Sequence, residues 1–196
     1  MWKANAQYDN VVITSRPYTT LHADSFNGTD DEKLTPAWVT APATAWVLAT
    51  TGAGAQVFRQ SADGNARAVH GAPTTDQIVT GDIRPATFYA GGGWAGLMAR
   101  HVNASAYYFA FLQSSGTVSL RRWMNGQVTV LDEAPFTVTA GTSYRLRLDA
   151  IGRNLRLYVN GQLVAEAVDA AIPQGRYGLI TYRTAAEFDN FNASRP

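Results

Sequence analysis

The sequence predicts an all-β protein built from two antiparallel sheets packed face to face, and three observations support this. Apolar and polar residues alternate with a period of two along most of the chain, in stretches rich in Val, Thr, Tyr, Phe and Leu. Gly residues and Asn-Gly pairs interrupt the alternation at short intervals, and no long window has the apolar spacing of a helix. Because each antiparallel strand has one apolar face, a single open sheet would leave that face in water, so two sheets must stack.

Two hairpins define the strand pattern. Asn125-Gly126 and Asn160-Gly161 each lie between alternating stretches, and Asn and Gly adopt the positive φ angles of a two-residue type I′ turn. A two-sheet antiparallel jelly roll is the arrangement that many short strands of this kind favour. In chain order, the further strands are expected at Gln56–Gln60, Ala66–Val69, Asp76–Pro85, Trp94–Val102, Ala106–Gln113, Ser143–Ala150, Arg176–Tyr182 and Glu187–Ala193.

Composition and charge exclude several classes of protein. The chain has 196 residues, 16 Lys and Arg against 15 Asp and Glu, a net charge of +1 and no Cys. Without Cys there is no disulfide and no thiolate site, and the scattered cations form no basic stripe for a phosphate backbone. The longest apolar stretches, such as Ala41–Ala49, are far shorter than the ~20 residues of a membrane helix. Neither nucleic acid nor a membrane is therefore expected as a partner.

The two ends of the chain share a short motif. Residues 6–10 (AQYDN) are similar to residues 186–190 (AEFDN), and each copy is followed by Ser-Arg-Pro. The copies lie about 180 residues apart, which is the size of one sandwich. We therefore expect residues 1–16 to be the closing strand of a preceding module, or a linker, and residues 17–196 to form the module itself. Chance similarity between two short Asp-Asn strands is the alternative.

Several segments resemble a known group of modules. These segments are VFRQSADGNARAV (57–69), AGLMARHVNASAYYFAFLQSSGTVSLRRW (95–123), YRLRLDAIGRNLRLYVNGQLVAEAVD (144–169) and QGRYGLITYRTAAEFDNF (174–191). They are similar to the concanavalin A-like, laminin-G-like β-sandwich modules appended to bacterial pectate lyases and other secreted polysaccharide-degrading enzymes. DSFNG (24–28) resembles the usual first strand of those modules. The resemblance implies the fold more strongly than the function, because this fold hosts lectins, accessory modules, glucanases and lyases.

The sequence contains no complete catalytic motif of the classes considered. GxSxG, HExxH, P-loop and GxGxxG motifs are absent. The E-x-D-x-x-E motif of sandwich-fold glucanases is incomplete, since Glu187 and Asp189 are followed by Asn192. No catalytic residue is therefore predicted for glycoside hydrolysis, which needs a pair of carboxyl groups.

A β-eliminating lyase is the open enzymatic alternative. It needs only a base, such as Tyr or His, and an Arg or amide that neutralises the uronate carboxylate. The residues that could serve are His101, Arg100, Tyr108 and Arg121. For His101 the competing interpretation is a hydrogen-bonded side chain at a strand end.

Alternation also predicts a binding face. We expect the bulkier row of one strand, Tyr107, Phe109 and Phe111, to fill the core between the sheets, which would place Tyr108 on the outer face. The same reasoning on the neighbouring strands predicts one shared outer face made of Arg100, Tyr108, Arg121 and Trp123.

This predicted face suits an acidic sugar chain. An aromatic surface stacks on a sugar ring, and Arg offers a bidentate fork to a carboxylate. Trp94, which follows three glycines, is expected on a mobile loop at the rim, and His101 is a further candidate. The alternative is that long Arg and aromatic side chains merely cover the sheet.

A structural Ca²⁺ is the cofactor that the resemblance implies. Modules of this group often bind one where the first and last strands meet, and Ca²⁺ prefers oxygen ligands. The residues that match are Asp24, Asn27 and Asp189. The alternative is that these side chains satisfy turns.

Together these observations predict a non-catalytic, secreted carbohydrate-binding module that holds an enzyme on an acidic polysaccharide such as a pectic chain. Its expected partners are the polysaccharide and a covalently linked enzyme or tandem module. The alternatives are the sandwich-fold polysaccharide lyase and a laminin-G-like adhesion module that binds protein. The three hypotheses differ in whether the chain binds a polysaccharide, cleaves it or binds a protein instead.

Overall fold

The computed structural model describes residues 17–27, 38–90 and 92–196. The expected boundary strand at residues 1–16 lies outside the described residues. The described elements are β1 (Thr19–Asp24), β2 (Val39–Ala41), the 3₁₀ turn η1 (Ala43–Ala45), β3 (Trp46–Thr50), β4 (Gln56–Gln60), β5 (Asn65–Thr74), β6 (Gln77–Phe88), β7 (Trp94–Asn103), β8 (Ala106–Gln113), β9 (Thr117–Met124), β10 (Gln127–Pro135), β11 (Tyr144–Ile151), β12 (Asn154–Val159), β13 (Gln162–Val168), β14 (Gly175–Tyr182) and β15 (Thr184–Arg195).

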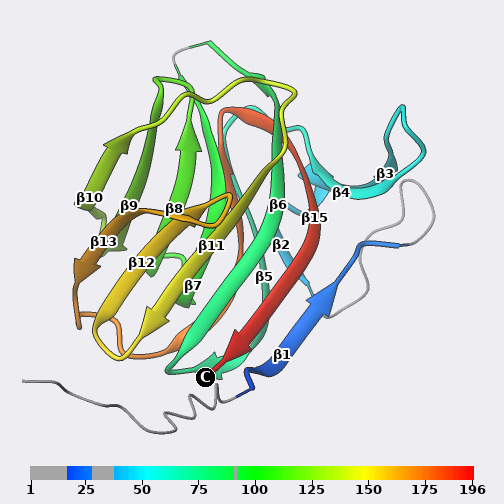
Figure 1. Cartoon of the computed structure of the whole chain (residues 1–196). Coiled ribbons are helices and arrows are strands. Elements are labelled where there is room, and N and C mark those ends of the chain that lie inside the picture. The colour runs from blue at the N-terminus through cyan, green and yellow to red at the C-terminus, as the bar shows by residue number, and fades with distance from the viewer. Residues whose placement is uncertain (1–16, 28–37, 91) are drawn as a thin grey trace, which may run out of the picture.

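The strands form two antiparallel sheets that pack face to face (Figure 1). Sheet 1 has the order β13-β12-β11-β6-β15-β4-β3, with β1 paired to β15, and sheet 2 has the order β10-β9-β8-β7-β14-β5-β2. The predicted all-β jelly-roll sandwich is confirmed. None of the helical segments in the described part of the chain could cross a membrane.

The two Asn-Gly hairpins are confirmed. Asn125 and Gly126 have φ angles of 52° and 80°, and Asn160 and Gly161 have φ angles of 50° and 83°. These pairs join β9 to β10 and β12 to β13. Asn and Gly tolerate this left-handed backbone better than other residues, and the turn twists in the same sense as the strands.

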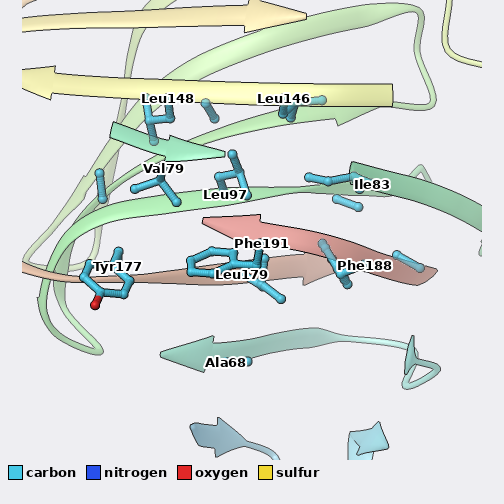
Figure 2. Packing of buried hydrophobic residues seen from close by; sticks show 14 of the residues in the cluster. Ala68, Val79, Ile83, Leu97, Leu146, Leu148, Tyr177, Leu179, Phe188 and Phe191 are labelled. Atoms are coloured by element: carbon cyan, nitrogen blue, oxygen red, sulfur yellow. The ribbon is translucent and has the colours of Figure 1, made fainter. Parts of the chain in front are cut away.

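The core lies between the sheets. Val79, Leu97, Leu148 and Leu179 are completely buried or nearly so, and Figure 2 shows their side chains meeting from strands of both sheets. Two opposed rows of branched apolar side chains exclude water from the space between the sheets, which supplies the main driving force for folding.

A group of rings closes one side of this core. The imidazoles of His22 on β1 and His70 on β5 stack with centroids 3.6 Å apart and an interplanar angle of 16°. Trp38 and Phe191 lie against them, at centroid distances of 5.2 Å from His70 and 6.2 Å from His22 respectively. The stacked pair therefore joins an edge strand of sheet 1 to sheet 2.

The predicted orientation of β8 is wrong. Tyr108, Ala110 and Leu112 belong to the core between the sheets, whereas Tyr107 and Phe109 belong to a second apolar cluster. Alternation correctly separates the two rows, but the assumption that the bulkier row faces the core fails. The bulkier row is itself buried by the indoles of sheet 2, so it needs no place between the sheets.

Candidate functional site

A pocket of about 410 Å³ lies on the outer face of sheet 2. Its floor and walls come from six strands and the turn between β7 and β8. The residues that line it are Asn65, Arg67, Trp94, Ala104, Tyr107, Phe109, Arg121, Trp123, Val128 and Tyr182.

The floor of the pocket is aromatic. Phe109 on β8 is 4% exposed, and its ring centroid lies 5.5 Å from those of both Tyr107 and Phe111. Met98 and Ile180, both completely buried, pack in the same cluster. Packing on both sides fixes these rings, so the floor is preformed.

Two indoles form the walls. Trp94, the first residue of β7, stacks on Phe111 with ring centroids 4.6 Å apart. Its ring centroid lies 5.8 Å from that of Tyr182. On the other side, the Trp123 Nε1–H donates a hydrogen bond to the Ala104 carbonyl at 3.0 Å. Both indoles are half-buried, so each keeps surface available to a ligand.

Two arginines border the aromatic rings in different electrostatic settings. The guanidinium carbon of Arg121 lies 4.9 Å from the Phe111 centroid, and its Nη2 contacts the Glu133 carboxylate at 3.0 Å. The guanidinium carbon of Arg67 lies 5.8 Å from the Tyr107 centroid, and its Nη1–H donates to the Ala104 carbonyl at 3.3 Å. Arg121 is therefore neutralised locally, whereas Arg67 has no carboxylate partner among the described residues.

His101 lies beside the pocket, beneath its surface. It is 6% exposed, and its ring stacks on Tyr107 with centroids 5.6 Å apart. Burial, together with the charges of Arg176 and Arg67, lowers its pKa to about 4, and burial is the largest of these causes. His101 is consequently neutral at pH 7, and its Nδ1 has no hydrogen-bond partner among the described residues.

Three of the predicted residues meet in this pocket. Arg121, Trp123 and Trp94 all line it, and His101 adjoins it through Tyr107. Trp94 begins a paired strand opposite Gln113 rather than standing on a loop. Whether these residues bind sugar stays a prediction.

Arg100 is not on the outer face, and its predicted role as a surface ligand residue is wrong. It has a φ angle of 50°, at a point where the register between β7 and β14 shifts by one residue, and it is 1% exposed. A bulge of this kind adds one residue to the strand and turns the next side chain to the opposite face. The Arg100 guanidinium donates hydrogen bonds of 2.7 to 3.1 Å to the carbonyl oxygens of Thr75, Ile172, Ala150 and Gly152.

Tyr108 is also misplaced by the prediction, because its row faces the core. Its hydroxyl donates to the Asp169 carboxylate at 2.5 Å and accepts the Ile172 N–H at 3.0 Å. Burial raises its pKa to about 12, and the hydrogen bond to Asp169 acts in the same direction. Arg122 contacts the same carboxylate. Tyr108 is therefore part of a buried polar network and lies away from the pocket.

Sequence reasoning missed Arg67, Tyr107, Phe109 and Tyr182. Arg67 could have been found, because it stands between Ala66 and Ala68, whose burial in the core sends Arg67 outward. Tyr182, at the end of β14, comes to the pocket only because β14 pairs with both β5 and β7.

The residues proposed for Ca²⁺ are divided between two hollows. Asp24 lines a hollow of about 300 Å³ where β1 meets β15, whereas Asp189 lines a different one with Asp82. The Asp24 carboxylate accepts hydrogen bonds from the Phe26 N–H at 2.8 Å and the Trp38 Nε1–H at 2.9 Å. The Asn27 side chain donates to Ser25.

These contacts restrict how an ion could be held. In the described part of the chain no three His, Cys, Asp or Glu side chains are grouped so that they could hold a metal. A Ca²⁺ at Asp24 would consequently depend on backbone carbonyls and water for most of its oxygen ligands. Calcium binding stays a prediction.

If Ca²⁺ binds only to the folded chain, chelation is expected to lower the melting temperature. A hundredfold excess of ion over Kd stabilises a protein by about 2.7 kcal/mol, which corresponds to roughly 5–10 °C for a chain of this size. Melting with and without EDTA in wild type, Asp24→Asn and Asp189→Asn measures this difference and assigns it to one hollow. Identical melting curves for wild type with and without chelator would contradict the prediction.

Sequence similarity to curated proteins covers a minority of the chain. No protein-family profile matches the chain. A levanase from Bacillus subtilis (strain 168) is 27% identical over 73 residues, which are 37% of this chain and 11% of the levanase. The chain thus matches only about a tenth of the length of that curated relative.

Solved structures are similar over most of the chain. The carbohydrate-binding module CBM66 from Bacillus subtilis has a TM-score of 0.69 and 24% identity, covering 81% of this chain and 95% of the module. The β-glucanase from Bacillus licheniformis has a TM-score of 0.63 and 13% identity, covering 91% and 98%. The GH43 protein BlXynB from the same species has a TM-score of 0.65 and 16% identity, covering 89% and 39%. This chain therefore shares its jelly-roll sandwich with a carbohydrate-binding module and with enzymes of other activities.

Proposed function

We propose that this chain is a non-catalytic carbohydrate-binding module and that the pocket on sheet 2 holds sugar rings of a polysaccharide. The observation that carries the proposal is the preformed aromatic floor, open to solvent between Trp94 and Trp123 and bordered by Arg67. Aromatic faces bind the apolar faces of sugar rings, while guanidinium groups offer hydrogen bonds to the polar substituents. A volume of about 410 Å³ suits a small number of rings rather than a protein surface.

The proposed setting is a larger, secreted polysaccharide-degrading protein. Two observations support it: the chain matches a tenth of a levanase, and its fold covers 39% of a GH43 protein. In this setting the module's partners are the polysaccharide and a covalently linked enzyme.

The polysaccharide itself has two candidates. An acidic chain such as polygalacturonate follows from the arginines at the pocket, and the pectate lyase modules that the sequence resembles point the same way. Levan, a neutral polymer, follows from the name of the levanase. Both are polymers of sugar rings and would use the same aromatic floor.

Replacing Trp94 or Trp123 with Ala is expected to lower affinity for the bound polysaccharide about tenfold or more. Each change removes one wall of the pocket, and aromatic anchors of this kind contribute well over 1 kcal/mol to binding. Affinity gel electrophoresis in polygalacturonate and in levan measures the loss. Tyr18→Ala is the matched control, because this exposed ring contacts Arg147 on sheet 1, away from the pocket.

Three results would contradict the proposal. Unchanged retention of both Trp variants, with their folds verified by thermal melting, would remove this pocket from consideration. An unsaturated uronate product, detected by ultraviolet absorbance, would favour the lyase alternative. Failure of the wild-type chain to bind any of the polysaccharides would favour the adhesion module.

A further inference from the structure

The charges around the pocket are unevenly distributed. On the β9 side, Arg121 is paired with Glu133 and also donates to the Ser119 hydroxyl at 2.8 Å. On the β5 and β14 side stand Arg67 and Arg176, and neither is within ion-pair distance of a carboxylate in the described residues. The uncompensated positive charge therefore lies on one side of the pocket, where Arg67 belongs to the lining and Arg176 stands outside it.

Ring contacts and one strand pairing relate these two arginines to Tyr107 and His101. The guanidinium carbon of Arg67 lies 5.8 Å from the ring centroid of Tyr107. The Tyr107 ring stacks on the His101 ring with centroids 5.6 Å apart. Arg176 on β14 is the register partner of His101 on β7. We call Arg67 and Arg176, with the rings of Tyr107 and His101 beside them, the cationic end of the pocket.

The electrostatic setting of His101 agrees with this geometry. Both Arg67 and Arg176 act on it, and each disfavours its protonated form. Among the causes of its lowered pKa, no neighbouring carboxylate acts in the opposite direction. The cationic end thus keeps a net positive potential at neutral pH, with a neutral imidazole and a phenol rather than an acid beside the guanidinium groups.

We propose that the cationic end receives the carboxylate of a uronate residue whose sugar ring lies on the aromatic floor. This inference rests on the proposed function and names its substrate class as an acidic rather than a neutral polysaccharide. A planar carboxylate accepts two parallel N–H bonds from one guanidinium. A site partly covered by aromatic rings strengthens such a bond relative to one in open water. The paired Arg121, by contrast, contributes mainly its contact with Phe111.

A pair of polymers that share one backbone but differ in charge tests the proposal. Polygalacturonate and its methyl ester share the same backbone, but the ester has no carboxylate charge. Titration of the wild-type chain with each polymer, with levan as a neutral comparison, is expected to show about tenfold or greater preference for the free acid. This preference should shrink as NaCl is raised, because exposed charge pairs are screened.

Single substitutions then identify the arginines that cause the preference for the free acid. Arg67→Gln and Arg176→Gln are each expected to reduce affinity for polygalacturonate several-fold more than affinity for the methyl ester. Arg153→Gln, which removes an exposed charge at the turn between β11 and β12, is the matched control and should keep the wild-type ratio between the two polymers.

The outcomes distinguish a failure of this inference from a failure of the proposed function. Equal affinity for the free acid and the ester, or a preference that survives Arg67→Gln and Arg176→Gln, would overturn the inference and leave the polysaccharide-binding function standing. A loss of preference in Arg153→Gln equal to that in Arg67→Gln would also overturn it, since only net charge would then matter. Absence of binding to every polymer would overturn the proposed function and this inference together.

Discussion

Replacing Arg100 with Met is expected to lower the free energy of unfolding by about 3–5 kcal/mol. Its guanidinium is 1% exposed and donates to four backbone carbonyls, including that of Ala150 on β11 of sheet 1 and that of Gly152 in the turn after β11. Met has a similar length but no donor, so these acceptors would lose their partner inside the protein. Urea denaturation followed by tryptophan fluorescence measures the change.

Two companion variants make this prediction specific. Arg100→Lys keeps the charge but replaces the planar fork with a single ammonium, so an intermediate loss of stability is expected. Arg153→Met, on the exposed turn after β11, should change stability by less than about 0.5 kcal/mol. A loss below about 1 kcal/mol in Arg100→Met would show that water replaces the guanidinium and that Arg100 does not hold the sheets together.

Acidification from pH 7 to pH 5 is expected to destabilise the fold through its histidines. The pKa of His70 and that of His101 both fall to about 4, in each case mainly because of burial, and for His70 the neighbouring His22 adds to the effect. The unfolded chain takes up these protons below about pH 6.5, whereas the folded chain does so only near pH 4. Stability that is complete above pH 6.5 is therefore lost as pH falls toward 4.

The expected size is about 2 kcal/mol at pH 5 for the buried His101 and roughly half of that for His70, which is partly open to solvent. Urea denaturation at pH 7, 6 and 5 measures it, in a range where few carboxylates titrate. The variants His70→Gln and His101→Gln keep a neutral polar side chain and should flatten the pH dependence. An unchanged slope in the double variant would assign the acid sensitivity to other groups.

The sequence predicted the elements of this fold better than the facing of their side chains. The Asn160-Gly161 turn requires a left-handed backbone that few residues adopt, so its location was readable directly. The orientation of β8 was not, because both of its rows are apolar and period two separates the rows without saying which one faces the other sheet. The inward or outward sense depends on what covers each face.

The candidate site was only partly predictable for a related reason. Arg121 and Trp123 lie on β9, whose inward residues Val118 and Leu120 are plainly apolar, so their outward position could be inferred. Arg100 was misplaced because a β-bulge with positive φ at an Arg leaves no mark in the alternation. Arg67 and Tyr182 reach the pocket through strand pairings between distant parts of the chain, and pairing order is not encoded locally.

The separation of the two apolar clusters has a consequence for engineering. The outer cluster around Phe109 and Met98 shares no residue with the cluster between the sheets, although both are built on the same strands. Positions such as Trp94, Trp123 and Arg67 could therefore be randomised in a display library while the inner cluster maintains the scaffold. If the pocket binds sugar as proposed, variants selected in this way would acquire new sugar preferences on a backbone whose architecture is specified by a different set of side chains.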